Sequence, residues 1–319
     1  MPTLVECVPN FSEGRDAEKI ARIVDAARAV PGVAILDLHS DASHNRSVLT
    51  FVGAPEAVRE AAIRLVGEAA RLIDMNAHRG EHPRIGATDV VPFIPVEGVS
   101  MEDCVRIAHA AGEEIFRRFA IPVYFYEAAA LRPNRRPLEN IRRGQYEGLR
   151  EAVLTDSSLR PDVCSSTGGP ALHPTAGATA VGARKFLVAF NVNLNTSDVA
   201  IAKMTARKIR TSGGGLPALK AIGVLLHHEV RLEGQGSEQD RAQVSMNLTD
   251  FEQTSMLAAH QAVEREVARL GVSIHSSELV GLAPQAAFGG ATPAQLKLAN
   301  FSAGMIFENR LKTTLAGGE

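Results

Sequence analysis

Apolar residues in the first half of the chain follow two different spacings. Apolar runs of strand length occur at residues 4–8, 33–38, 47–52, 90–96 and 122–126. Between these runs, apolar residues recur every three or four positions, which predicts helices after Asp16, after Pro55 and over residues 101–119. Asp16 is a favoured N-cap residue, and Pro55 suits the first turn of a helix. The expected order is strand, helix, strand, strand, helix, strand, followed by one more helix and one more strand.

The second half of the chain repeats this order. Strands are expected at residues 186–194, 221–226, 243–248 and 272–279, and helices at 198–209 and 256–270. Such an order is the pattern of ferredoxin-like folds. We therefore expect an α+β protein with two sequential ferredoxin-like (βαββαβ-type) α/β subdomains, residues 1–180 and 181–319, the second ending in a helical tail. One large mixed sheet is the alternative arrangement.

Composition narrows the class of protein and its partners. The 319 residues are 45% hydrophobic and 22% charged, as in ordinary globular proteins, and their number suits two domains of roughly 150 residues. Lys and Arg number 34 against 36 Asp and Glu. This near-neutral chain lacks the basic excess that nucleic acid or an anionic membrane surface attracts, so we expect neither as a partner.

Three features of the sequence favour a cytoplasmic location. The three cysteines form no C-x-x-C pair, which is consistent with a reducing compartment. The N-terminus lacks a basic stretch followed by an apolar one. No apolar run reaches the roughly 18 residues that a membrane span needs. We therefore expect a cytoplasmic protein.

A glycine-rich segment, residues 161–182, joins the two halves. It contains Gly168, Gly169, Gly177 and Gly182 among prolines, serines and threonines. Such a segment is either a plain linker or a ligand-binding loop, because glycines let backbone N–H groups approach a ligand closely.

The densest polar segment is His-Arg-Gly-Glu-His-Pro-Arg at residues 78–84. It matches H-x-x-E-H, in which two histidines one helical turn apart bind zinc and the glutamate acts as a base. Gly80 and Pro83 oppose the continuous helix that this site needs, and no third ligand is apparent on a downstream helix. We therefore expect no metal.

As a loop, the same segment presents the imidazole of His82, which can take and return a proton near neutral pH. The neighbouring Glu81 is placed to orient this ring. Arg79 and Arg84 supply positive charge for the carboxylates of a substrate. A solvated loop without a chemical role is the alternative.

A second polar cluster lies at the turn between two expected strands and comprises Asp37, His39, Asp41, His44, Asn45 and Arg46. It is either a polar binding site, with Arg46 as a cation for substrate, or a simple turn. In the simple turn, Asp41 and Asn45 are turn formers and Arg46 pairs with Asp41.

Two expected strands of the second half carry amides and a hydroxyl on one face. Residues 190–194 alternate apolar side chains with Asn191 and Asn193, and residues 243–248 alternate similarly. Neutral donors and acceptors of this kind suit a polar planar ligand such as a pterin. A buried seam between domains that is bridged by water would show the same pattern.

Several long segments of the chain are similar to one known family. The first, at residues 4–14, reads Leu-Val-Glu-Cys-Val-Pro-Asn-Phe-Ser-Glu-Gly, and others follow in order at 72–95, 142–149, 177–193 and 244–251. They closely resemble the glutamate formimidoyltransferase family, the formiminotransferase half of formimidoyltransferase-cyclodeaminase. The similarity covers roughly residues 2–287. No helical cyclodeaminase domain would fit in the remaining chain, so we expect a stand-alone transferase.

The resemblance implies an activity, a co-substrate and an assembly. It implies transfer of the formimino group from N-formimino-L-glutamate to N5 of tetrahydrofolate, giving 5-formiminotetrahydrofolate and L-glutamate in histidine degradation. Tetrahydrofolate, with its polyglutamate tail, is then a co-substrate, and no metal is required. The family also implies two α/β subdomains with a folate-binding groove between them, and a homodimer.

The same resemblance places functional residues. The catalytic histidine falls on His82. The folate-contacting segment falls on Gly169, Pro170, Ala171, Leu172, His173, Pro174, Thr175, Ala176 and Gly177. The polar strand residues Asn191 and Asn193 complete the expected folate site, and residues expected to bind the other substrate are Asn10, Asn45, Arg46, Arg79 and Arg84.

Two other functions remain compatible with the sequence. His39 stands where the mammalian relatives have an acidic residue, which leaves the chemical identity of the donor open. N-formyl-L-glutamate is an alternative donor, because it differs from the formimino compound by one heteroatom at the transferred carbon. A catalytically silent folate-binding protein is the alternative from a different functional class.

Overall fold

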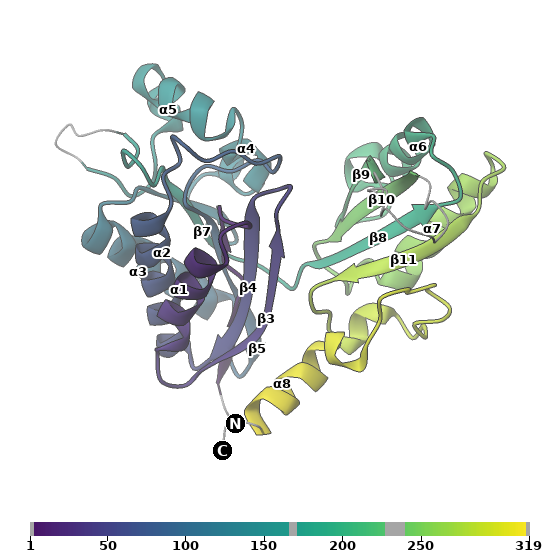
Figure 1. Ribbon diagram of the computed structural model, residues 1–319, viewed down its shortest axis with the longest axis horizontal. Helices are drawn as coiled ribbons and strands as arrows, with labels where there is room; N and C mark the ends of the chain where they lie inside the picture. The colour runs from purple at the N-terminus through teal and green to yellow at the C-terminus, as the bar shows by residue number, and fades with distance from the viewer. Residues whose placement is uncertain (1–2, 166–170, 227–239, 317–319) are drawn as a thin grey trace. The chain divides into compact units, whose positions relative to one another are not determined.

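The computed structural model describes residues 3–165, 171–226 and 240–316 of the chain. Contacts between residues divide the chain into two compact units, residues 1–184 and 185–319. Each unit has its own sheet and mixes helices with strands (Figure 1). The structure thus confirms an α+β protein with two sequential subdomains and excludes the single large sheet.

The first unit contains a seven-stranded sheet. Its strands are β1 (Leu4–Cys7), β2 (Asn10–Phe11), β3 (Val33–Asp41), β4 (Arg46–Gly53), β5 (Thr88–Glu97), β6 (Val123–Glu127) and β7 (Thr179–Ala183). β1 and β2 follow each other along one line, because both pair with β4 and with β5. β3 pairs with β4 on one side, while β7 and then β6 extend the sheet beyond β5 as parallel strands.

The long helices of this unit are α1 (Ala17–Arg28), α2 (Pro55–Leu72) and α3 (Met101–Phe119). Their N-terminal residues explain where they begin. The carboxylate of Asp16 accepts backbone N–H groups of the first turn of α1, and Pro55 occupies the first turn of α2. The side chain of Ser100 caps α3 in a reciprocal capping box. All three helix positions agree with the sequence prediction.

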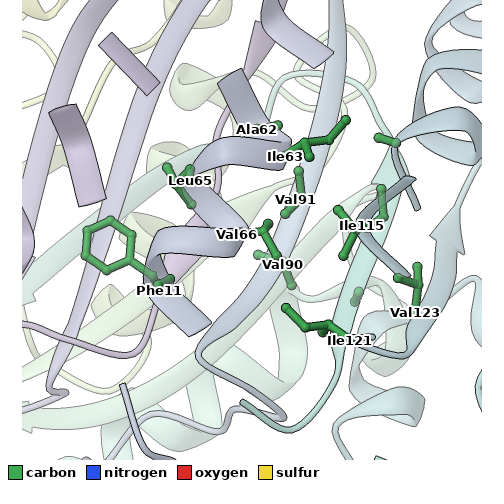
Figure 2. Packing of buried hydrophobic residues seen from close by; sticks show 14 of the residues in the cluster. Phe11, Ala62, Ile63, Leu65, Val66, Val90, Val91, Ile115, Ile121 and Val123 are labelled. Atoms are coloured by element: carbon green, nitrogen blue, oxygen red, sulfur yellow. The ribbon is translucent and has the colours of Figure 1, made fainter. Parts of the chain in front are cut away.

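The apolar faces of these helices form one core with the sheet. Figure 2 shows Leu65 and Val66 of α2 in the same cluster as Phe11 of β2, Val90 of β5 and Ile115 of α3. At most 5% of the surface of any of these five residues is exposed. Burial of this apolar area is the main force that holds the helices against the sheet, at about 25 cal/mol per Å².

The second unit repeats the element order of the first. Its strands and helices are β8 (Val188–Leu194), α6 (Val199–Ile209), β9 (Leu219–Leu226), β10 (Arg241–Leu248), α7 (Met256–Ala268), β11 (Ile274–Val280) and α8 (Phe307–Ala316). The four strands pair antiparallel in the order β11, β8, β10, β9, which matches β5, β1, β4, β3 of the first unit. Within the described ranges, no helix of either unit is long and apolar enough to cross a membrane.

Four strands and α-helices of the first unit were not predicted from the sequence: β2, β7, α4 and α5. Thr179–Ala183, which the analysis placed mainly in the glycine-rich segment, is β7, a fully buried strand between β5 and β6. Its short sequence, Thr-Ala-Val-Gly-Ala, carries a weak strand signal, and its neighbours in the sheet supply the missing stabilisation. The helices α4 (Leu138–Ile141) and α5 (Gln145–Thr155) were also not predicted. α4 has only four residues, and in neither helix does the N-cap side chain make a capping hydrogen bond.

We expect the Phe51→Ala substitution to lower the free energy of unfolding by about 3–5 kcal/mol, because it opens a cavity in the core. Phe51 lies on β4, and none of its surface is exposed. Urea denaturation of the variant measures the change. Leu131→Ala is the matched control in the same unit, because 60% of Leu131 is exposed. Equal effects of the two substitutions would contradict the core position of Phe51.

Candidate active site

Asn45 joins three loops at one end of the first sheet. It lies in the turn between β3 and β4 with a φ of 48°, a left-handed conformation that Asn tolerates better than most residues. Its Oδ1 accepts a hydrogen bond from the backbone N–H of Gly14 (2.9 Å), and its Nδ2 donates to the carbonyl of Arg79 (3.0 Å). Both ends of this predicted substrate-binding side chain are therefore engaged within the protein.

His78 and Arg84 belong to a buried network in the loop before β5. The Nε2 of His78 lies 3.0 Å from the carbonyl oxygen of Asn45, and its Nδ1 accepts a hydrogen bond from Nε of Arg84 (3.2 Å). The guanidinium of Arg84 also donates to Gln145 (2.8 Å) and forms a two-pronged pair with Glu147 (2.8 and 2.6 Å). Burial lowers the pKa of His78, which favours its neutral form. The positive charge of Arg84 is thus paired within the protein.

His82 lies in the same loop and is half-buried. Its Nδ1 is 2.7 Å from the carbonyl oxygen of Pro83. Because a carbonyl oxygen only accepts, Nδ1 carries the proton, and Nε2 keeps its lone pair. Burial, together with the positive charges of Arg46 and Arg142, lowers the pKa of His82 to about 3. The ring is therefore a neutral acceptor at neutral pH.

Two arginines place positive charge beside His82. Arg46 is the first residue of β4, and burial and the charge of Arg142 lower its pKa to about 10. Arg142, which follows α4, forms an ion pair with Asp89 at the start of β5. The Nε atoms of both arginines are buried and have no hydrogen-bond acceptor among the described residues. Arg142 was not predicted from the sequence, although its segment belongs to the family resemblance.

The described part of the predicted folate segment, Ala171–Gly177, packs against the loop of His82. The backbone N–H of Ala87 donates to the carbonyl of Ala176 (2.9 Å), which ties the segment to the residues just before β5. Nδ1 of His173 accepts backbone N–H groups from Ala176 (3.0 Å) and Thr175 (3.3 Å). The proton of the neutral ring is therefore on Nε2. Gly169 and Pro170 lie outside the described residues.

Asn191 and Asn193 belong to the second unit, where they form a polar network on β8. Nδ2 of Asn191 donates to Glu278 (3.3 Å), and Nε2 of Gln243 donates to Asn193 (2.9 Å) and Glu278 (2.5 Å). Nδ2 of Asn193 donates to the hydroxyl of Ser276 (3.2 Å). Sequence reasoning found the polar face but missed Glu278, which adds a carboxylate to it.

Three further residues were singled out in the sequence: Asn10, Arg79 and His39. Nδ2 of Asn10, which is buried, donates to the carbonyl of Val8 (2.8 Å). Arg79 donates to the carbonyls of Asn76 (3.0 Å) and His78 (2.7 Å). His39 is exposed on β3. Asn10 and Arg79 thus use at least part of their donor capacity to hold the backbone in place.

Residues 78–84 form no helix, as the sequence analysis expected from Gly80 and Pro83. The two histidines of the H-x-x-E-H pattern have different hydrogen-bond partners. His78 bonds to Asn45 and Arg84, whereas His82 bonds to Pro83. No group of three or more potential metal ligands occurs in residues 3–165, 171–226 and 240–316.

Comparison with known families identifies the relatives of this chain. The model of the formiminotransferase domain, N-terminal subdomain, matches residues 4–184. The model of the formiminotransferase domain matches residues 189–297. The chain belongs to the formiminotransferase family. Both structural units therefore have counterparts in this family.

Individual formiminotransferase relatives are similar over nearly the whole chain. "Glutamate formimidoyltransferase" of Streptococcus pyogenes is 45% identical over 98% of this chain and 99% of its own length. The protein of the same name from Thermoplasma acidophilum is 44% identical over 97% and 98%. "Formimidoyltransferase-cyclodeaminase" of Rattus norvegicus is 44% identical over 89% of this chain. The match spans 51% of that longer protein.

We expect the Asn45→Ala substitution to lower the free energy of unfolding by about 1–2 kcal/mol, because it removes two hydrogen bonds of the buried Asn45 side chain, to the partly buried backbone groups of Gly14 and Arg79. Thermal unfolding followed by circular dichroism measures the change. Asn140→Ala is the control, because Asn140 is exposed. A loss below about 0.5 kcal/mol, the usual range of surface substitutions, would show that Asn45 does not hold the loops together.

We also expect His82 of the free protein to stay neutral between about pH 5 and 8, because its pKa is lowered to about 3. The unfolded chain protonates this ring near its usual pKa of about 6.5 and so binds more protons than the folded chain. His82 therefore contributes a loss of stability as pH falls below about 6.5. NMR titration of the ring signal, assigned by its disappearance in His82→Gln, measures the pKa. A midpoint near 6.5 would contradict this environment.

Proposed function

We propose that this chain transfers the formimino group from N-formimino-L-glutamate to N5 of tetrahydrofolate, giving 5-formiminotetrahydrofolate and L-glutamate. The similarity to two proteins named glutamate formimidoyltransferase over nearly the whole chain supports this reaction. One structural observation carries the proposal. His82 is a neutral imidazole whose Nδ1–H is held by the Pro83 carbonyl, so that Nε2 is left as a base.

The reaction requires one proton to leave N5 of tetrahydrofolate and one to reach the departing glutamate nitrogen. N5 attacks the formimino carbon, a C–N bond forms, and the C=N double bond becomes single in a tetrahedral intermediate. Nε2 of His82 accepts the proton from N5 and then donates it to the glutamate nitrogen. The bond between that nitrogen and the carbon breaks as the C=N bond reforms. Glutamate leaves as the amine, and His82 returns to its neutral form.

Each unit offers its own set of candidate residues for folate binding. In the first unit, Ala171–Gly177 offers backbone groups and Nε2–H of His173, whose tautomer is set by two backbone donors. In the second unit, the polar face with Asn191 and Asn193 offers the donors and acceptors that the edge of a pterin ring needs. Gly169 and Pro170 remain part of the proposed folate segment on the strength of the family resemblance.

The setting of this reaction is a further part of the proposal. We place it in the cytoplasm, as a step of histidine degradation, with folate polyglutamates as the physiological co-substrates. We also propose a homodimer, as the family resemblance implies. The net charge of -2 supports small-molecule substrates over nucleic acid.

We expect the His82→Gln substitution to reduce turnover by about 10²- to 10⁴-fold, because the variant lacks the group that moves the proton. Tetrahydrofolate should bind with roughly unchanged affinity. The assay mixes enzyme, tetrahydrofolate and N-formimino-L-glutamate, and acid then converts the 5-formimino product to the methenyl form, whose absorbance is read. Titration calorimetry measures folate binding.

His109→Gln is the control for this experiment. His109 lies on α3, where its Nε2 is 2.8 Å from the carbonyl oxygen of Ala129, and it should not affect proton transfer. Near-normal turnover of His82→Gln would assign the base to another residue. Absence of any signal with the wild-type protein, together with a signal from N-formyl-L-glutamate, would move the assignment to the formyl donor.

A further inference from the structure

Two half-buried arginines beside His82 have unused hydrogen-bonding capacity. The side chain of Arg46 makes no hydrogen bond or ion pair with any described residue, and its Nε is buried. Arg142 pairs with Asp89, yet its own Nε is also buried without an acceptor. A buried donor without a partner costs about 1–3 kcal/mol, and more when the group is charged. The unpaired Nε atoms of Arg46 and Arg142 therefore favour the binding of an anionic ligand.

The strand register brings the two arginines to the same end of the sheet. Phe11 of β2 pairs with Ser47 on one side and with Thr88 on the other. Arg46 precedes Ser47, and Asp89, the partner of Arg142, follows Thr88. The backbones of β4 and β5 are thus about 10 Å apart here, two strand spacings. Long arginine side chains can close this gap around a small dicarboxylate.

The charges around His82 leave an excess of positive charge. Arg46 and Arg142 act on the ring together, and Asp89 opposes them. The ring of His44 lies 6.0 Å from that of His82, and its Nδ1 is 2.8 Å from the carboxylate of Asp41. Asp89 pairs with Arg142 and Asp41 with His44, so these two carboxylates act on Arg46 without forming an ion pair with it.

We propose that Arg46 and Arg142 together bind the two carboxylates of the glutamate-derived donor, and that Arg142 is a specificity-determining residue. This inference rests on the proposed function, because N-formimino-L-glutamate carries two carboxylates, each of which can pair with one guanidinium. Arg84 is unsuited to this role because Glu147 and Gln145 already occupy its guanidinium. Nη1 of Arg79 already donates hydrogen bonds to two backbone carbonyls.

Binding of the donor carboxylates to Arg46 and Arg142 also changes the basicity of His82. In the free protein, burial is the main cause of the low pKa of His82, and the charges of Arg46 and Arg142 further oppose protonation of its ring. Two carboxylates bound to these arginines neutralise that effect, so His82 becomes a stronger base when the donor is in place. Proton transfer is then most favourable in the complex that contains the substrate.

The decisive experiment compares donors and variants. N-formimino-L-glutamine has a neutral amide in place of the side-chain carboxylate. We expect the wild-type protein to prefer the glutamate donor in kcat/KM on the order of 10²-fold or more, as expected for a buried charge pair. In Arg46→Gln and Arg142→Gln, this preference should fall to a few-fold, while the KM for tetrahydrofolate stays near the wild-type value. Arg143→Gln is the control, because Arg143 is exposed.

NMR titration of His82 gives a readout that a purely structural role would not change. L-glutamate should raise the His82 pKa in the wild-type protein. In Arg142→Gln the pKa of the free protein should already be higher, and L-glutamate should shift it less. Arg142→Lys, which keeps a cation for Asp89, replaces Arg142→Gln if the latter does not fold. It should restore the salt-dependent part of donor binding but not the full preference for glutamate.

The outcomes separate this inference from the proposed function. If the wild-type protein turns over the glutamate donor and the arginine variants keep the full preference for it over N-formimino-L-glutamine, the arginine pair is refuted while the transferase stands. If the wild-type protein shows no turnover, the proposed function fails. Loss of L-glutamate binding in Arg46→Gln and Arg142→Gln, measured by calorimetry, would still support the anion site in that case.

Discussion

The geometry of the candidate site depends on the buried amide of Asn45. This side chain connects the loop after β2, through Gly14, with the loop before β5, through Arg79. Its backbone carbonyl also contacts the ring of His78. Since unpaired polar groups in this place would be costly, the three loops form one unit and shift together or not at all. The position of His82, four residues after His78, follows from this arrangement.

Positive charge at this end of the sheet lowers the basicity of His82 in the free protein and attracts the carboxylates of the substrate in the complex. Together with burial, which is the larger cause, it keeps His82 neutral, as a proton acceptor must be, but it also weakens the ring as a base. The two carboxylates of the substrate offset the part of this effect that comes from the arginines. Asp89 limits this effect, because it pairs with Arg142 and, through its other oxygen, accepts the backbone N–H of Ile85 (3.0 Å). One carboxylate thus fixes both an arginine and the chain that leads into β5.

The spacing of apolar residues along the sequence predicted most of the fold, and the polar segments predicted part of the candidate site. The long helices and most strands follow from apolar periodicity, and Asp16 shows where the first helix begins. β7 could not be found in this way, because Thr-Ala-Val-Gly-Ala becomes a strand only between β5 and β6. The sequence also indicated a loop around His82, but it could not reveal Arg142. Charge pairs between residues far apart in the chain, such as Arg142 with Asp89, are set by tertiary structure alone.

Arg46 and Arg84 show why residue type does not determine role. Both are arginines in the polar segments that the sequence analysis selected, and both were expected to bind substrate. Arg84 meets Glu147, Gln145 and His78, so its charge is used to fix a loop and to orient a neutral histidine. The side chain of Arg46 forms no ion pair with a carboxylate among the described residues, although Asp89 and Asp41 act on its charge, and its Nε is buried without an acceptor. A protein keeps such a buried cation at a cost in stability, and binding of an anion is the physical process that recovers that cost.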